Sequence, residues 1–134
     1  MNKKVLITGG LGYIGSHISL MLFQLGFDVY IIDSFINCSP INLRNLKEVD
    51  NKKNKNILNG IYIKKGDIRD LDFLESLFSD YSKNENKFNA VLHLAGLKSV
   101  YQSTLDPIKY WDVNVNGTIN LLKVMRKFDC KNII

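Results

Sequence analysis

The segment that most constrains the fold of this 134-residue chain is a glycine-rich run, Thr8-Gly9-Gly10-Leu11-Gly12-Tyr13-Ile14-Gly15. It follows residues 4–8, which are mostly apolar and β-branched, a pattern typical of a parallel strand buried on both faces. Apolar residues then recur at helical spacing from Ile14 to Leu25, and Gly26 follows as a stop signal. The run therefore predicts a tight turn that leads from a buried strand into a helix.

Strand and helix patterns continue to alternate along the rest of the chain. Strand patterns cover residues 28–33, 61–67 and 90–96, and helical patterns cover residues 40–48, 70–78 and 106–128. Polar tracts at residues 51–56 and 82–87 are expected loops, and residues 131–134 resemble the opening of a fifth strand. Such alternation predicts right-handed βαβ units. The expected fold is one α/β domain over residues 1–134, a Rossmann-like doubly wound parallel sheet that breaks off at the start of its fifth strand.

Composition and charge argue against several other classes of protein. The net charge is +5, but the densest lysine cluster lies in an Asn/Lys tract at residues 51–56 without an aromatic residue, so no nucleic-acid partner is expected. No apolar stretch is long enough to cross a bilayer, and the chain enters a strand pattern directly after residues 1–3, without a signal peptide. We therefore expect a cytoplasmic protein with no membrane partner. Cys38 and Cys130 lack CxxC spacing and a nearby histidine, so neither a disulfide nor a metal site is expected.

Each of the first four strand patterns ends in a glycine or a carboxylate. The first leads into the glycine run, the second ends at Asp33, the third at Asp67 and the fourth at Ala95-Gly96. In a doubly wound sheet, ligands bind outside the carboxyl ends of the strands. Because strand, glycine turn, helix and acid are all in register, the sequence predicts a dinucleotide-binding site at these ends.

The glycine run has the residue types that bind a pyrophosphate. Gly9 and Gly12 allow a tight turn and a close backbone approach, and Gly15 allows the helix to pack closely on the strand. The amides of Tyr13 and Ile14 would then point from the helix N-terminus at the pyrophosphate, where the helix dipole also favours an anion.

The acid at the end of the second strand pattern selects between two cofactors. Asp33 lies at the expected distance downstream of the glycines to accept hydrogen bonds from both adenosine ribose hydroxyls. A carboxylate there repels a 2′-phosphate, and no arginine stands beside it to compensate. The sequence therefore predicts NAD in preference to NADP.

The other strand ends supply further candidate contacts. Asp67 and the Ile68 amide are candidates for the adenine edge, Ala95 and Gly96 leave room for the nicotinamide-side ribose, and Lys98 offers a donor to ribose or phosphate. Asp67 fits a turn-forming aspartate equally well, and Lys98 fits a solvated surface lysine. Three further residues are expected to be structural: His17, His93 and Trp111.

Four motifs together resemble the extended short-chain dehydrogenase/reductases. They are TGxxGxxG at residues 8–15, the acid Asp33, GDIRD at residues 66–70 and HLAG at residues 93–96. Within that family the chain is most similar to the UDP-glucose 4-epimerases, on GYIGSH at residues 12–17, AGLKSV at residues 95–100 and NVNGT at residues 114–118.

This resemblance implies a redox epimerisation of a UDP-sugar on tightly held NAD, and a homodimer formed through helices that include residues 106–128. It also implies that the loop after Asp33 contacts adenosine and that Asn114 is structural. The cofactor-binding residues expected in all are Gly9, Gly12, Tyr13, Ile14, Gly15, Asp33, Ser34, Asn37, Cys38, Asp67, Ile68, Leu94, Ala95, Gly96 and Lys98.

The family's catalytic Tyr-X-X-X-Lys is absent, because none of the six tyrosines is followed four residues later by lysine. In the family this motif follows the fifth strand, so no catalytic residue is assigned. We expect the cofactor half of an epimerase, present as a fragment, a truncated gene model or one product of a split gene, and inactive by itself. The alternatives are another extended dehydrogenase/reductase acting on a nucleotide sugar, such as a 4,6-dehydratase, and a non-catalytic NAD-binding module.

Overall fold

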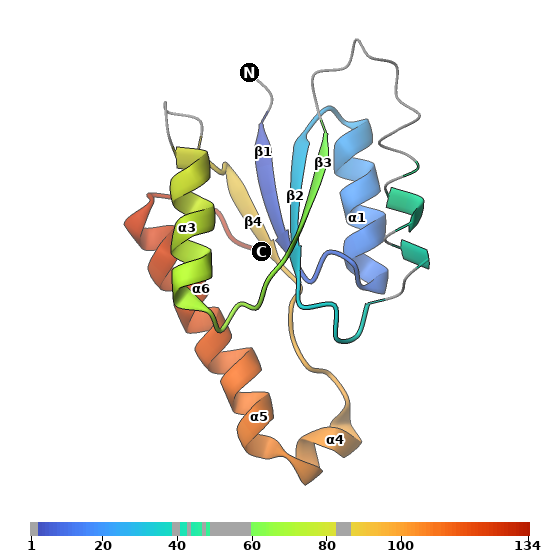
Figure 1. Ribbon diagram of the computed structural model, residues 1–134, viewed down its shortest axis with the longest axis vertical. Coiled ribbons are helices and arrows are strands. Elements are labelled where there is room, and N and C mark those ends of the chain that lie inside the picture. Colours follow the sequence, from blue (N-terminus) through green and yellow to red (C-terminus); the bar gives the residue numbers. More distant parts are fainter. Residues whose placement is uncertain (1–2, 39–40, 43, 47, 49–59, 83–86) are drawn as a thin grey trace.

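A parallel sheet with helices on both faces forms the framework of the chain (Figure 1). The computed structural model describes residues 3–38, 41–42, 44–46, 48, 60–82 and 87–134. Its labelled elements are, in order, β1 (Lys4–Thr8), α1 (Tyr13–Gln24), β2 (Asp28–Asp33), β3 (Ile61–Lys65), α3 (Leu71–Ser82), β4 (Ala90–His93), α4 (Val100–Leu105), α5 (Pro107–Trp111), the π-helical segment η2 (Asp112–Asn116) and α6 (Gly117–Lys127).

The strand order is β3-β2-β1-β4, with every pairing parallel. The chain moves outward from β1 through β2 to β3 and then crosses to the other side of β1 to form β4. The loops that follow β1 and β4 are therefore neighbours, at the switch point where ligands bind in such sheets. Next to β4, Ile133 forms a parallel bridge with Val91, so the expected opening of a fifth strand is confirmed. The predicted doubly wound fold is confirmed as well.

Side chains from β1 and β2 are buried on both faces of the sheet. Leu6 and Ile32 belong to a core cluster with residues of α3 and α6, whereas Val5 and Ile31 belong to a second cluster that includes Phe23 of α1. Figure 1 shows this division, with α3 and α6 on one face and α1 on the other. The continuous apolar runs in the sequence reflect this two-sided burial.

Two strands end earlier than predicted, and in both a side chain accepts a hydrogen bond from a backbone amide just beyond the strand end. β3 stops at Lys65, and Asp67 then turns the chain by accepting a hydrogen bond from the Arg69 amide at 2.9 Å. β4 stops at His93. The Leu94 amide still donates to the Thr8 carbonyl at 3.0 Å, but the Ala95 amide donates to the Thr8 hydroxyl at 3.2 Å instead.

The helices follow the predictions with two differences. Residues 107–127 are helical as predicted, but η2 interrupts α-helical geometry, with the Gly117 amide bonded five residues back to the Asp112 carbonyl. α4 was not predicted: Ser99 caps it, and its apolar side chains are exposed, so its sequence lacks a buried-face pattern. The expectation that Trp111 is structural gains no support, because its side chain is 67% exposed and outside the core.

The remaining sequence predictions concern helix starts and loops. Asp70 caps α3 as expected, accepting a hydrogen bond from the Phe73 amide at 2.9 Å. In the predicted helix 40–48, the described residues 41–42, 44–46 and 48 are helical, and the others lie outside the described residues. The predicted loop 51–56 also lies outside them. Of the predicted loop 82–87, Ser82 is instead the last residue of α3, and residues 83–86 lie outside the described residues. Within the described ranges, no helix has the length and apolar character needed to cross a membrane.

Candidate functional site

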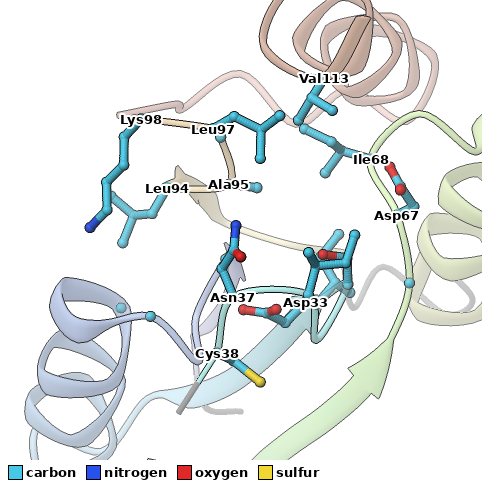
Figure 2. Close-up of a pocket in the computed structure, with 18 of the residues that line it drawn as sticks. Asp33, Asn37, Cys38, Asp67, Ile68, Leu94, Ala95, Leu97, Lys98 and Val113 are labelled. Carbon is cyan, nitrogen blue, oxygen red and sulfur yellow. The ribbon is translucent and has the colours of Figure 1, made fainter. Parts of the chain in front are cut away.

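A cavity of about 590 Å³ opens at the carboxyl ends of the strands (Figure 2). This volume lies within the range of small-molecule and cofactor sites. All fifteen residues that the sequence predicted for the cofactor line it: Gly9, Gly12, Tyr13, Ile14, Gly15, Asp33, Ser34, Asn37, Cys38, Asp67, Ile68, Leu94, Ala95, Gly96 and Lys98. In Figure 2, Asn37 points toward Leu94 and Ala95 on the opposite wall.

The glycine turn lies against the loop that follows β4. Gly9 has a φ of +67°, and a Cβ placed on it would lie 2.7 Å from the Ala95 nitrogen, so only glycine fits. A Cβ on Gly15 would lie 2.6 Å from the Gly10 Cα. Gly15 therefore packs against the turn itself, rather than against the strand as predicted.

The first turn of α1 is open toward the cavity. Gly12 is its N-cap and contributes no capping side chain, and no acidic residue stands in the first turn of this fully described helix. Tyr13 and Ile14, which begin the helix, are both exposed and line the cavity. An uncapped helix N-terminus without an acidic residue in its first turn favours an anion.

The Asp33 carboxylate is 91% buried at the end of β2. Its Oδ2 accepts a hydrogen bond from the Leu11 amide at 3.1 Å, and its Oδ1 accepts one from the Phe35 amide at 2.9 Å. Phe35 itself has a φ of +64°, a strained conformation for a residue other than glycine. Each carboxylate oxygen can still accept a second donor from the cavity.

Asp67 pairs with a residue that sequence analysis did not select. Arg69 donates to the Asp67 carboxylate from Nη2 at 2.7 Å and from Nε at 3.1 Å, and to Asp112 from Nη1 at 2.9 Å. The Arg69 guanidinium lowers the pKa of both carboxyl groups below their usual range. Asp67 therefore lines the cavity as an ionised group that Arg69 already holds.

The loop after β4 is held by the helical segment that faces it. The Asn114 side chain, in η2, accepts a hydrogen bond from the Leu97 amide at 2.8 Å and donates to the Leu97 carbonyl at 2.9 Å. This two-point contact supports the structural role expected of Asn114. Lys98, next in the loop, is exposed and lines the cavity.

Eight further residues line the cavity: Ile32, Ile36, Asn42, Gly66, Arg69, Leu97, Lys109 and Val113. Ile32, Gly66 and Leu97 are neighbours of predicted residues, so their positions could have been inferred. Lys109 and Val113 come from α5 and η2, and no local pattern connects them with the glycine run.

The family's Tyr-X-X-X-Lys motif is absent from the described residues that line the cavity. Tyr13 is the one tyrosine among the described residues of the lining, and His17 stands four residues after it where the family motif has lysine. Among the described residues, no group of three His, Cys, Asp or Glu side chains is placed to hold a metal ion.

A glycine turn, an open helix N-terminus and an acid at the end of the second strand, around one cavity at the switch point, define a dinucleotide-binding domain of the Rossmann type. The family model described as GDP-mannose 4,6 dehydratase matches residues 6–134. The chain therefore belongs to that family.

Proteins similar to this chain include several UDP-glucose 4-epimerases. UDP-glucose 4-epimerase 2 of Arabidopsis thaliana is 40% identical over 134 residues, which are all of this chain and 36% of that protein. The bifunctional UDP-glucose 4-epimerase and UDP-xylose 4-epimerase 1 of Pisum sativum is 41% identical over 133 residues, 99% of this chain and 36% of the relative. The chain thus spans about a third of the length of these relatives, and the resemblance inferred from the motifs is confirmed.

Solved structures give the same result. The UDP-glucose 4-epimerase from Bifidobacterium longum, crystallised with NAD+ and UDP, superposes with a TM-score of 0.82 at 37% identity, covering 98% of this chain and 36% of that one. The enzyme from Stenotrophomonas maltophila, crystallised with NAD and formylated UDP-arabinopyranose, superposes with a TM-score of 0.80 at 33% identity, covering the same shares of each chain.

Proposed function

We propose that this chain is the NAD-binding part of a UDP-glucose 4-epimerase, which interconverts UDP-glucose and UDP-galactose by transient oxidation at C4. The observation that carries this proposal is the single cavity that brings together the glycine turn, Asp33 and the AGLKSV loop. The similar epimerases that were crystallised with NAD support it.

The residues present fit a dinucleotide. The pyrophosphate would lie over Gly9 and Gly12 and accept hydrogen bonds from the Tyr13 and Ile14 amides, in a helical turn that contains no acidic residue. Gly15 keeps this helix close to the turn.

The adenosine half would lie over the ends of β2 and β3. The Asp33 carboxylate would accept hydrogen bonds from the two ribose hydroxyls. Its negative charge would repel the 2′-phosphate of NADP, so NAD is preferred to NADP. Asp67 and the Ile68 amide would meet the adenine edge. Three residues of the loop after β2 would flank the adenosine: Ser34, Asn37 and Cys38.

The nicotinamide half would lie against the loop after β4. Leu94, Ala95 and Gly96 would leave room for the second ribose, and Lys98 would donate to ribose or phosphate. When bound, NAD would supply the hydride acceptor for oxidation at C4 of the sugar. The residues of this chain would bind and orient it, and they would move no proton.

The purified chain of 134 residues provides the first test. We expect calorimetry to detect weak NAD binding, weaker NADP binding, and no conversion of UDP-galactose to UDP-glucose. Epimerase turnover by this chain would refute the assignment of the proton-transfer residues to another part of the protein. The coding sequence downstream of Ile134 provides the second test: an in-frame Tyr-X-X-X-Lys supports an epimerase, and a stop codon supports a non-catalytic NAD-binding module.

A nucleotide-sugar 4,6-dehydratase is the second candidate, because the matching family model carries a dehydratase description. A chain extended by the downstream sequence separates the two activities. An epimerase returns a sugar with an inverted C4 hydroxyl, whereas a dehydratase accumulates a 4-keto-6-deoxy sugar that is detected by mass spectrometry.

We also propose that the complete protein is a homodimer with α5 and α6 in its interface. Four apolar side chains on these helices are exposed: Ile108, Trp111, Ile119 and Leu122. Analytical ultracentrifugation of the extended chain tests this, and a monomer at micromolar concentration would contradict it.

A further inference from the structure

The His93 imidazole is hydrogen-bonded at both ring nitrogens to residues from different elements. Nδ1 lies 2.7 Å from the hydroxyl of Thr8 in β1, and Nε2 lies 2.8 Å from the hydroxyl of Thr118 in α6. His93 itself is the last residue of β4. One side chain thus connects two adjacent strands and the helix that covers them.

The outer partner of Thr118 fixes the direction of its hydrogen bond to His93. The Asn114 carbonyl only accepts, so the Thr118 hydroxyl, 2.6 Å away, donates to it. The Thr118 oxygen is then left to accept from His93 Nε2–H. Burial lowers the pKa of His93, which favours the neutral imidazole, and in a neutral ring with its proton on Nε2 the Nδ1 atom accepts. The Thr8 hydroxyl, 2.7 Å away, therefore donates to Nδ1, while its oxygen accepts from the Ala95 amide at 3.2 Å. The bond to Thr118 thus selects the Nε2–H tautomer of the neutral imidazole.

The series of hydrogen bonds that begins at the Ala95 amide ends at Asn114, which in turn contacts Leu97 in the same loop as Ala95. The Asn114 carbonyl accepts the last bond of the chain, and its side chain holds the Leu97 backbone at 2.8 and 2.9 Å. Ala95 and Leu97, which line the cavity on either side of Gly96, are thus both tied to the same residue of η2. A π-helical turn at this point is consistent with a functional site.

We propose that His93 is a positioning residue: as the Nε2–H tautomer it links η2 to the Ala95 amide and so sets the position of the cavity wall that receives the nicotinamide-side ribose. This inference rests on the proposed NAD-binding function for the identity of the ligand. The bond network itself is independent of that function.

Nitrogen NMR tests the tautomer without any ligand. The chain has two histidines, and His17 Nδ1 lies 2.8 Å from the Tyr13 carbonyl, which only accepts. When neutral, His17 therefore carries its proton on Nδ1, the opposite of His93. We expect the His93 signals to be those of the Nε2–H tautomer, with the His17→Gln variant assigning them. A His93 signal protonated at Nδ1 would overturn the proposal.

Substitutions test whether the network positions Ala95. Thr8→Val removes the hydroxyl between His93 and Ala95, whereas Thr8→Ser retains it. We expect Thr8→Val to raise the hydrogen-exchange rate of the Ala95 amide and to weaken NAD binding by roughly tenfold each, with Thr8→Ser close to the parent chain. Thr118→Val interrupts the same chain of bonds, so the double variant should be weakened by less than the product of the two single effects.

The outcomes separate this inference from the proposed function. If neither the parent chain nor any variant binds NAD, the assignment of the ligand fails. The positioning role of His93 still stands in that case if the hydrogen-exchange rate of the Ala95 amide follows the expected pattern. If NAD binds and neither Thr8→Val nor Thr118→Val changes its affinity or the Ala95 exchange rate, the positioning role is refuted. Should Thr8→Val fail to fold, Thr118→Val and His93→Asn, which keeps an acceptor for Thr8 but loses the bond to Thr118, carry the same test.

Discussion

The Asp33 carboxylate accepts a hydrogen bond from the Leu11 amide at 3.1 Å, a contact that joins the end of β2 to the glycine turn after β1. Its second oxygen accepts from the Phe35 amide at 2.9 Å. The side chain proposed to bind the ribose therefore also holds together the two loops that surround the ribose site. Substitution of Asp33 is expected to affect both stability and binding.

Asp33→Ala should destabilise the chain by about 1–3 kcal/mol, because it leaves the buried Leu11 amide without an acceptor. It should also weaken NAD binding by at least about tenfold, through loss of two charge-assisted hydrogen bonds. Asp33→Asn is the matched control, since it retains one acceptor oxygen and should narrow the preference for NAD over NADP. Urea unfolding and calorimetry with both dinucleotides measure these effects, and unchanged NAD affinity in Asp33→Ala would contradict the ribose placement.

Reversal of the cofactor preference needs a positive charge as well. Asp33→Gly combined with Ser34→Arg should bind NADP more tightly than NAD, because the carboxylate is gone and a guanidinium can pair with the 2′-phosphate. Competition titrations of the two dinucleotides give the ratio. A double variant that still prefers NAD would place the source of the preference elsewhere in the cavity.

Gly9→Ala should be far more damaging than Gly26→Ala, although both glycines have positive φ values, +67° and +89°. A Cβ at position 9 would meet the Ala95 backbone at 2.7 Å, whereas one at position 26 has no neighbour within 4 Å. We expect about 1 kcal/mol of destabilisation at Gly26 with NAD binding retained. At Gly9 we expect more than about 2 kcal/mol and loss of binding. Equal effects of the two variants would argue against close contact between the glycine turn and the β4 loop.

Cys38 provides a probe of occupancy without any substitution. It is partly exposed and lines the cavity, whereas Cys130 is buried. Burial and the neighbouring Asp33 charge raise the pKa of the Cys38 thiol, so it reacts slowly at neutral pH and faster as the pH rises. We expect a maleimide to label Cys38 before Cys130, and NAD to slow that labelling. Peptide mass spectrometry locates the label; Cys38 labelling that NAD leaves unchanged would exclude Cys38 from the adenosine site.

Stability should decrease as the pH falls through the titration range of histidine. Burial lowers the pKa of His93 below its ordinary value of 6.5, so the folded chain binds this proton less readily than the unfolded chain. The contribution of neutral His93 is complete above pH 6.5 and is lost as the pH falls from 6.5 through the lower folded pKa. Urea unfolding between about pH 8 and pH 5 should show a smaller acid loss in His93→Asn than in the parent chain. Identical pH profiles of the free energy of unfolding in the variant and the parent chain would mean that His93 does not contribute to the acid loss of stability.

Short-range signals in the sequence account for most of the framework. β1 and β2 have the predicted bounds, because β-branched runs that are bounded by glycine or aspartate indicate strands buried on both faces. The capping role of Asp70 could also be predicted, because a capping side chain accepts a hydrogen bond from a backbone amide within the same helical turn. α4 was missed because its stability does not depend on an apolar face directed at the core.

The predicted cofactor residues line one cavity because parallel strands place their carboxyl ends at one edge of the sheet. The alternation of strands and helices in the sequence, which predicts such a sheet, therefore already implies the site. The partners of those residues did not follow from the sequence. Arg69 pairs with Asp112, 43 residues away, and His93 meets Thr8, 85 residues away. Such pairs depend on strand register and on the position of a helix over the sheet. Neither of these can be predicted from the local spacing of apolar residues.

The sequence by itself therefore determined the alternation of strands and helices and the glycine turn, because each depends on backbone conformation or apolar spacing over a few residues. Together with the motifs it also indicated fifteen of the residues that line the cavity. Only the tertiary structure decided how those residues are held: Asp33 by Leu11, Asp67 by Arg69, and Ala95 through Thr8 and His93. Hydrogen bonds of this kind require donors and acceptors from distant segments to meet within about 3 Å, and that condition is met only when the segments have packed together.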